Sequence, residues 1–171
     1  GLSDESRNRL IEIDKRLIEF GISYSENIAK DKTELKFSEA ELSGLSKNEL
    51  NNLKKDKGKF IITMAYPNVN AVSENCNVRS TREKVWKAFN NRAVKDNIPI
   101  HKEAVLLRNE KSKLFGFETW AEYRLRNRMA KNPKNVDSMY RDLIPKLQKS
   151  AEKEKKELVI DNIEINDTVS Y

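Results

Sequence analysis

The sequence predicts a mainly α-helical protein, a multi-helix array with one short β-strand or hairpin and a lean hydrophobic core. Apolar residues recur at helical spacing along most of the chain. Several Ser/Thr-x-x-Glu capping boxes mark helix starts, whereas a single stretch alternates with a period of two. Hydrophobic residues make up 37% of the chain, below the ~45–50% of a typical globular domain. The core is therefore expected to be small.

The first third of the chain predicts one long helix and two short ones. Ser3 opens the long helix, which carries these residues on one side: Leu10, Ile13, Leu17, Tyr24 and Ile28. "FSEAEL" (37–42) and "LSKNEL" (45–50) then repeat one arrangement, a capping box preceded by an apolar residue. Ser38 with Glu41 and Ser46 with Glu49 form these boxes, so each segment is expected to start a short helix.

The best strand is "KFIITMAYP", residues 59–67. Its alternation places four residues on one face, Phe60, Ile62, Met64 and Tyr66, and Pro67 is expected to end the run. The other plausible β segment is "LVIDNIEI", residues 158–165. The predicted sheet is thus tiny or incomplete.

Helices resume at Ser80, which forms a capping box with Glu83. Pro99 suits the first turn of the following helix, and Gly116 suits its left-handed end. Thr119 and Glu122 cap the next helix. Asn132-Pro133 starts the last one, which Pro145 is expected to kink or split, and whose inward residues are Val136, Met139, Tyr140, Leu143 and Leu147. The predicted structural core of this half comprises Trp86, Phe89, Leu107, Leu114, Phe117, Trp120 and Tyr123.

Groups for chemistry are scarce. A structural zinc site needs about four Cys or His ligands and a catalytic one about three, whereas Cys76 and His101 are the whole supply here. A Cys76–His101 nucleophile pair has no third orienting group signalled in the sequence. The 5 glycines do not cluster into a phosphate loop. We therefore assign no catalytic residue, no metal ligand and no cofactor to this chain, and leave the substrate-binding residues unassigned.

A basic run is the one feature that suggests nucleic acid: Arg124, Arg126, Arg128, Lys131 and Lys134, preceded by Trp120 and Tyr123. Helical spacing spreads those cations around the helix, and the net charge is only +6, so we expect no nucleic-acid partner. No apolar run approaches the ~20 residues of a membrane span, which predicts no membrane partner. The lone cysteine excludes an internal disulfide and fits a reducing, cytoplasmic compartment.

Two blocks of this chain resemble a known family. "KFIITMAYPNVNAVSENCNVRSTREKVWKAFNNRA" and "EAVLLRNEKSKLFGFETWAEYRLRNRMAKNP" look like the corresponding run of the thimet oligopeptidase, neurolysin and saccharolysin family of zinc metallopeptidases. "LIEIDKRLIEFGISYSENIAKD" and "FSEAELSGLSKNEL" extend the similarity to about residues 3–157. The resemblance implies a helical two-domain ellipsoid split by a channel, with the H-E-x-x-H zinc helix downstream of the matched region.

By this resemblance, residues 1–171 form a single helical subdomain of the non-catalytic wall, and residues 158–171 link it to a missing catalytic domain. The implied partners are that catalytic domain and short peptides, with zinc as cofactor of the parent enzyme, which would be cytoplasmic or mitochondrial. The chain alone is expected to be inactive. Two alternatives stay open: a stand-alone helical interaction module without hydrolytic activity, and a nucleic-acid-binding module.

Overall fold

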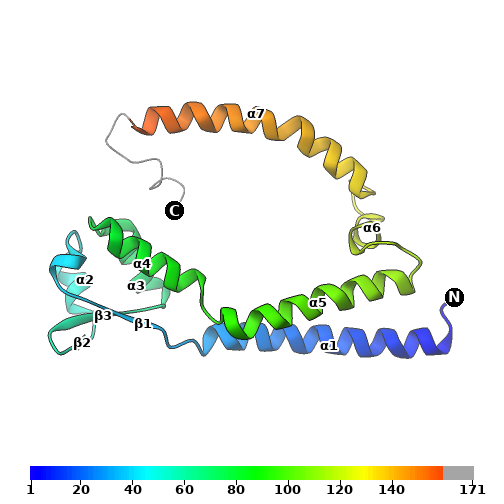
Figure 1. Cartoon of the computed structure of the whole chain (residues 1–171), viewed down its shortest axis with the longest axis horizontal. Coiled ribbons are helices and arrows are strands. Elements are labelled where there is room, and N and C mark those ends of the chain that lie inside the picture. The colour runs from blue at the N-terminus through cyan, green and yellow to red at the C-terminus, as the bar shows by residue number, and fades with distance from the viewer. Residues whose placement is uncertain (160–171) are drawn as a thin grey trace. The chain divides into compact units, whose positions relative to one another are not determined.

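The computed structural model describes residues 1–159, and these are mainly helical, as predicted (Figure 1). Within that range lie seven α-helices, one short 3₁₀ turn and three strands. In chain order the elements are α1 (Asp4–Ala29), β1 (Glu34–Phe37), η1 (Ala40–Leu42), α2 (Lys47–Asn51), β2 (Lys55–Asp56), β3 (Lys59–Thr63), α3 (Tyr66–Asn75), α4 (Arg79–Asn90), α5 (Val94–Leu114), α6 (Trp120–Leu125) and α7 (Pro133–Val159).

The chain divides into two compact units. Of the described residues, the helical unit comprises Gly1–Ser25 and residues 95–159, and the sheet unit comprises Glu26–Val94. Each unit is described by itself below. The predicted strand at 158–165 falls mostly outside the described residues, and so does most of the predicted linker at 158–171.

In the helical unit, α1 and α5 run antiparallel and are joined along their length by ion pairs (Figure 1). Ser3 opens α1 as predicted, because its hydroxyl accepts the backbone N–H of Ser6 at 3.2 Å. The Arg9 guanidinium donates to both carboxylate oxygens of Glu110, at 2.6 and 3.0 Å. Further along the two helices, Arg16 of α1 pairs with Glu103 of α5 at 3.4 Å. Lys111 of α5 also pairs with Asp14 of α1. Such exposed pairs stabilise little, so their main effect is to specify the register.

Two predictions about α5 have different outcomes. Pro99 does not start the helix: α5 begins at Val94, and Pro99 lies inside it. Pro99 is the sixth residue of α5, beyond the first-turn positions whose N–H groups have no intrahelical partner, so the helix lacks one backbone hydrogen bond there. The left-handed end at Gly116 is confirmed, with φ +79°. The N–H of Phe117 donates to Ser112 O at 3.0 Å and that of Gly116 to Lys113 O at 2.9 Å, which is the Schellman pattern.

The sheet unit contains a three-stranded antiparallel sheet in the order β1-β3-β2. The strand partners differ from the predicted one: Phe37 of β1 pairs with Phe60, and Asp56 of β2 pairs with Lys59. Lys57 and Gly58 join β2 to β3 with φ of +48° and +78°, the positive values of a tight two-residue hairpin turn. A lysine at the first turn position hides this hairpin from the usual Asn-Gly or Asp-Gly signature.

The predicted strand at 59–67 is correct only to Thr63. Phe60, Ile62 and Met64 are buried as its alternation requires, but Tyr66 is 67% exposed and begins α3. Pro67 therefore lies in the first turn of a helix rather than ending a strand, since proline fits that position without losing a hydrogen bond.

The core of the sheet unit gathers residues from the sheet, η1, α3 and α4. Its buried members are Phe37, Leu42, Leu45, Phe60, Ile62, Val69, Val72, Cys76 and Val85, with Phe89 packed against them. The prediction that Trp86 belongs to the core is wrong, because this residue is 42% exposed. On α4 the buried face is Thr81, Val85 and Phe89, and one residue further along a helix lies about 100° around its axis.

Capping in this unit is correct at two predicted boxes and wrong at one. Ser46 and Glu49 form the full box that starts α2, and Ser38 and Glu41 form the equivalent contacts before η1, a turn of three residues. Ser80 does not open α4. That helix starts at Arg79 after Val78 without a side-chain cap, so Ser80 lies one residue inside the helix.

In the second half of the helical unit, the Thr119–Glu122 box starts α6 as predicted. Asn132 caps α7, its side-chain oxygen accepting the Asn135 N–H at 2.9 Å. Pro145 does not split α7, which continues to Val159 with a curved axis (Figure 1), a gentler form of the expected kink. The expectation that α7 turns its apolar residues inward is wrong for Met139, Tyr140, Leu143 and Leu147, which are exposed.

Candidate functional site

Residues 1–159 contain no cluster of three or more His, Cys, Asp or Glu side chains arranged to hold a metal. The donors singled out from the sequence lie in different units: Cys76 is buried in the sheet unit, and His101 is exposed on α5 of the helical unit. A catalytic zinc needs about three protein ligands. The described donor set does not fit that requirement, so we derive no metal chemistry from these residues.

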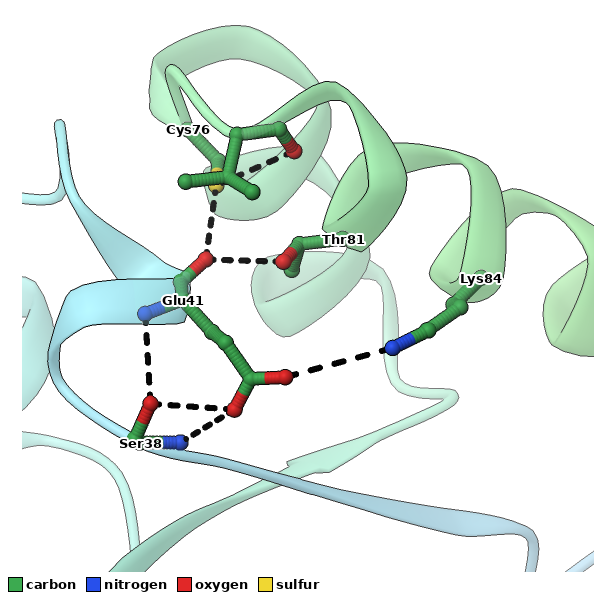
Figure 2. Close-up of polar contacts among 6 residues, drawn as sticks. Ser38, Glu41, Cys76, Thr81 and Lys84 are labelled. Carbon is green, nitrogen blue, oxygen red and sulfur yellow. Dashed lines mark hydrogen bonds and ion pairs between the residues drawn. The ribbon is translucent and has the colours of Figure 1, made fainter.

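Cys76 takes part in a polar network that ties η1 to α3 and α4 (Figure 2). Its thiol donates to the backbone oxygens of Glu41 at 3.4 Å and of Val78 at 3.8 Å. The same oxygen of Glu41 accepts the hydroxyl of Thr81 at 2.8 Å. A reactive cysteine is partly exposed in electropositive surroundings, whereas this thiol is 3% exposed and faces carbonyl oxygens. Cys76 is therefore structural.

The Glu41 carboxylate is the charged member of this network. The Ser38 backbone N–H donates to it at 2.9 Å and the Ser38 hydroxyl at 3.0 Å, while Lys84 lies 3.9 Å away. These donors, the Ser38 backbone first, lower the pKa of Glu41 below its ordinary value. A general acid-base group needs a pKa near the working pH, so this carboxylate serves as a cap.

At the corner between α5 and α6, aromatic rings gather on one tyrosine. Tyr123 stacks on Phe115 at a centroid distance of 4.9 Å and contacts Trp120 at 5.4 Å and Phe117 at 5.7 Å. The core residues predicted for this corner, Leu107, Leu114, Phe117, Trp120 and Tyr123, are half-buried rather than fully buried. Beside this cluster, three of the basic residues singled out from the sequence line a hollow together with Tyr123 and Asn127: Arg124, Arg126 and Arg128.

The last helix presents what we call the α7 apolar face: Met139, Tyr140, Leu143, Ile144 and Leu147. Their spacing of one, three and four residues puts them on one side of the helix. The exposed fractions of these five residues lie between 39% and 56%. The sequence pattern identified this face correctly as apolar, but it gave no information about whether a partner lies within the chain.

None of the helices in the described range has the length and apolar character needed to cross a bilayer. The exposed apolar residues of α7 alternate with ion pairs on the same helix, Arg141 with Asp137 and Lys146 with Asp142. The described residues thus form a helical scaffold that exposes both apolar and charged side chains on α7.

Comparison with known proteins assigns this scaffold to a family. The family model for Peptidase family M3 matches residues 72–162, more than half of the chain. The thimet-like oligopeptidase of Dictyostelium discoideum is 36% identical over 140 residues, covering 80% of this chain. Oligopeptidase A of Salmonella typhimurium is 32% identical over 170 residues, covering 90% of this chain. Saccharolysin of Saccharomyces cerevisiae is 28% identical over 153 residues, covering 85% of this chain. The chain belongs to Peptidase family M3.

The chain spans only a part of the length of these relatives: 21% of the thimet-like oligopeptidase and of saccharolysin, and 25% of oligopeptidase A. The similarity therefore identifies the family, and the resemblance noted in the sequence is confirmed at that level.

Proposed function

We propose that this chain is part of the non-catalytic wall of a zinc metalloendopeptidase that hydrolyses short peptides. Its membership of Peptidase family M3, over about a quarter or less of the length of the relatives, is the observation that supports this function. The role of the wall is confinement: it shapes a channel that admits short peptides, while the zinc site and the hydrolytic step belong to the remainder of the parent enzyme.

The partner that we propose is the rest of the same parent enzyme, which packs on the α7 apolar face. Contiguous exposed apolar side chains mark interaction surfaces, and this face lies inside the segment matched by the family model. The relatives are about four to five times as long as the matched region, from the covered shares of 25% and 21%. They therefore contain ample chain to cover such a face. We also propose that the parent enzyme is cytoplasmic. A further part of the proposal is that the two units belong to a single subdomain of that enzyme.

Hydrolysis of a quenched fluorescent peptide of about eight residues tests the division of labour. We expect no turnover by the purified chain, with or without added zinc, and no stoichiometric zinc by metal analysis. Zinc-dependent, chelator-sensitive turnover that follows the chain through purification would overturn the proposal, because a metal site would then exist in the chain.

A second experiment tests the partner. The chain is co-expressed with Salmonella oligopeptidase A from which the aligned region has been removed, and peptide turnover and co-purification are measured. We expect a complex that Leu143→Asp abolishes and that Gln148→Asp, a matched new charge at an exposed polar position of α7, leaves intact. A complex indifferent to Leu143→Asp would assign the contact to another surface.

The stand-alone interaction module remains the second candidate, and the α7 apolar face is the observation that favours it. That reading requires the purified chain to bind peptides or a protein through this face without any catalytic remainder. Peptide turnover in the reconstituted complex would decide against it.

A further inference from the structure

The surface just after α6 is strongly cationic. Between Glu122 and Asp137 the chain carries five basic residues and no acidic one, Arg124, Arg126, Arg128, Lys131 and Lys134. The three arginines, with Tyr123 and Asn127, line a hollow of about 290 Å³ that we call the arginine hollow. Its volume suits one small charged group with its immediate neighbours, because whole drug-sized ligands occupy pockets of about 300–1,000 Å³.

Aromatic rings hold two of these guanidinium groups in place. The Arg126 guanidinium carbon lies 4.6 Å from the ring centre of Tyr123 and 5.3 Å from that of Phe117. Arg124 lies 5.6 Å from the ring of Trp120. Stacking on a ring occupies the face of a guanidinium and leaves the N–H groups at its edge free to donate. The aromatic cluster therefore orients the donors and lowers the entropy lost on binding.

The charge of the hollow is not neutralised within the described part of the chain. No carboxylate there forms an ion pair with Arg124, Arg126 or Arg128. The nearest acid in sequence, Glu122, accepts the N–H groups of Thr119 and Glu118 at 3.2 and 3.1 Å. By contrast, Arg141 on α7 pairs with Asp137 at 2.7 Å. The hollow thus offers oriented arginine forks that no carboxylate of residues 1–159 pairs with.

We propose that the arginine hollow binds a carboxylate group of a peptide. The planar fork of arginine matches the two oxygens of a carboxylate, which it binds with two parallel hydrogen bonds. The choice of a peptide as ligand rests on the proposed function, whereas the choice of a carboxylate rests on the hollow alone. Either an acidic side chain or the carboxyl terminus of a peptide supplies this group.

Nucleic acid is the less suitable ligand for this surface. Binding to nucleic acid depends on many phosphates contacted along a continuous basic track. Here the hollow is confined to residues 123–128. Arg126 lies over the rings of both Tyr123 and Phe117, and Phe115 stacks on Tyr123, so a base would have to compete for these ring faces.

Trp120 provides the readout, because its ring contacts Tyr123 and Arg124 beside the hollow. Trp86→Phe leaves Trp120 as the sole tryptophan. Fluorescence titrations compare five probes: an acetylated, amidated peptide with two glutamates, a neutral acetylated peptide with a free carboxyl terminus, its amidated form, inorganic phosphate, and an oligothymidylate of about twelve nucleotides. The first two probes distinguish the two sources of the carboxylate.

We expect a carboxylate probe to bind and the neutral amidated peptide not to bind. Arg126→Gln should weaken binding roughly tenfold by removing the fork, and Arg126→Lys should weaken it by less because the charge remains. The matched control Arg141→Gln removes the same charge from an arginine with a partner on α7, and should leave binding unchanged. Circular dichroism verifies that each variant is folded.

Four results would overturn the inference. They are absence of carboxylate binding up to about 10 mM, equal loss in Arg141→Gln and Arg126→Gln, phosphate binding as tight as that of the best carboxylate probe, and tighter binding of oligothymidylate. The first two would remove the site, and the last two would assign it to another anion. The titrations involve no turnover, so their failure leaves the proposed function standing, and an active isolated chain would leave the site standing.

Discussion

Gly44 lies where the backbone of the sheet unit passes close to Asn75 and Asn77, so Gly44→Ala should destabilise this unit strongly. The residue sits between the buried Leu42 and Leu45, and its φ of +106° is outside the range that L-amino acids readily adopt. A Cβ added there would lie 2.1 Å from the backbone oxygen of Asn75 and 2.8 Å from the Asn77 nitrogen. Backbone atoms must move to admit it.

Two costs add up at Gly44. A left-handed conformation costs a non-glycine residue about 1–2 kcal/mol, and forcing extra volume into a packed site costs about 1–3 kcal/mol. The expected loss in the free energy of unfolding is therefore roughly 2–5 kcal/mol. The hydrogen bond from the Asn77 N–H to Ser43 O, at 2.7 Å, lies beside the clash and is expected to lengthen.

Gly58→Ala separates the two costs. Gly58 has a φ of +78°, but a Cβ added to it would meet no atom within 4 Å, so only the conformational cost of about 1–2 kcal/mol applies. Urea unfolding is followed by the fluorescence of Trp86 in a Trp120→Phe background, since Trp86 belongs to the same unit as both glycines. If Gly44→Ala costs no more than Gly58→Ala, the close approach at Asn75 does not exist in solution.

Three further predictions concern other parts of the fold. Gly21→Ala in the middle of α1 should stabilise the chain by about 0.5–1 kcal/mol, because alanine favours a helix over glycine and no atom lies within 4 Å of the added Cβ. A lower midpoint of thermal unfolding would contradict the open space at that position. Thr81→Val should cost about 1–2 kcal/mol by urea unfolding, since it removes a fully buried hydroxyl that donates to Glu41 O at 2.8 Å, and an unchanged midpoint would mean that the thiol of Cys76 replaces it. Hydrogen bonds from Thr33, and from the backbone of Ala93, lower the pKa of Asp31 below its ordinary value of 3.8. The ionised Asp31 side chain therefore stabilises the fold above that ordinary pKa, and this stabilisation is lost as the pH falls through the folded-state pKa. The free energies of unfolding at about pH 7 and pH 3 should thus differ less in Asp31→Asn than in the parent chain, and an equal difference would refute this role of Asp31.

The parts of the fold that local chemistry determines were predicted from the sequence. Caps at Ser46, Thr119 and Asn132 and the glycine end at Gly116 involve groups within a few residues of one another. Their signals are complete in a short stretch of chain. The same holds for the buried face of β3 up to Thr63, because side chains alternate across a strand whatever its partners are.

The features that depend on distant segments were not predictable in this way. β1 and β2 are four and two residues long, too short to show a period. Trp86 was expected in the core because it is large and apolar, yet the helix register gives that place to Thr81 and Val85. The α7 apolar face has the pattern of a buried face, and no pattern in one helix states where its partner lies.

The arginine hollow likewise combines a part that the sequence predicts with a part that depends on the fold. The sequence singled out Arg124, Arg126 and Arg128 as cations but gave no sign that two of them rest on aromatic rings. Those contacts join the turn before α6 and the first turn of α6 to the end of the same helix, and only a structure brings them together. Arginine four to nine residues from Phe117 and Trp120 is at most a weak signal for such stacking.

Because Cys76 is buried and is the only cysteine of the chain, its thiol can serve as a probe of how often the sheet unit opens. A thiol reagent reaches it only when the segment around η1 separates from α3 and α4, so the labelling rate measures how often that opening occurs. The helical unit has no cysteine in its described residues and stays silent in the same experiment. Loosening of the sheet unit by a ligand, a substitution or a partner can thus be timed separately in the unaltered protein.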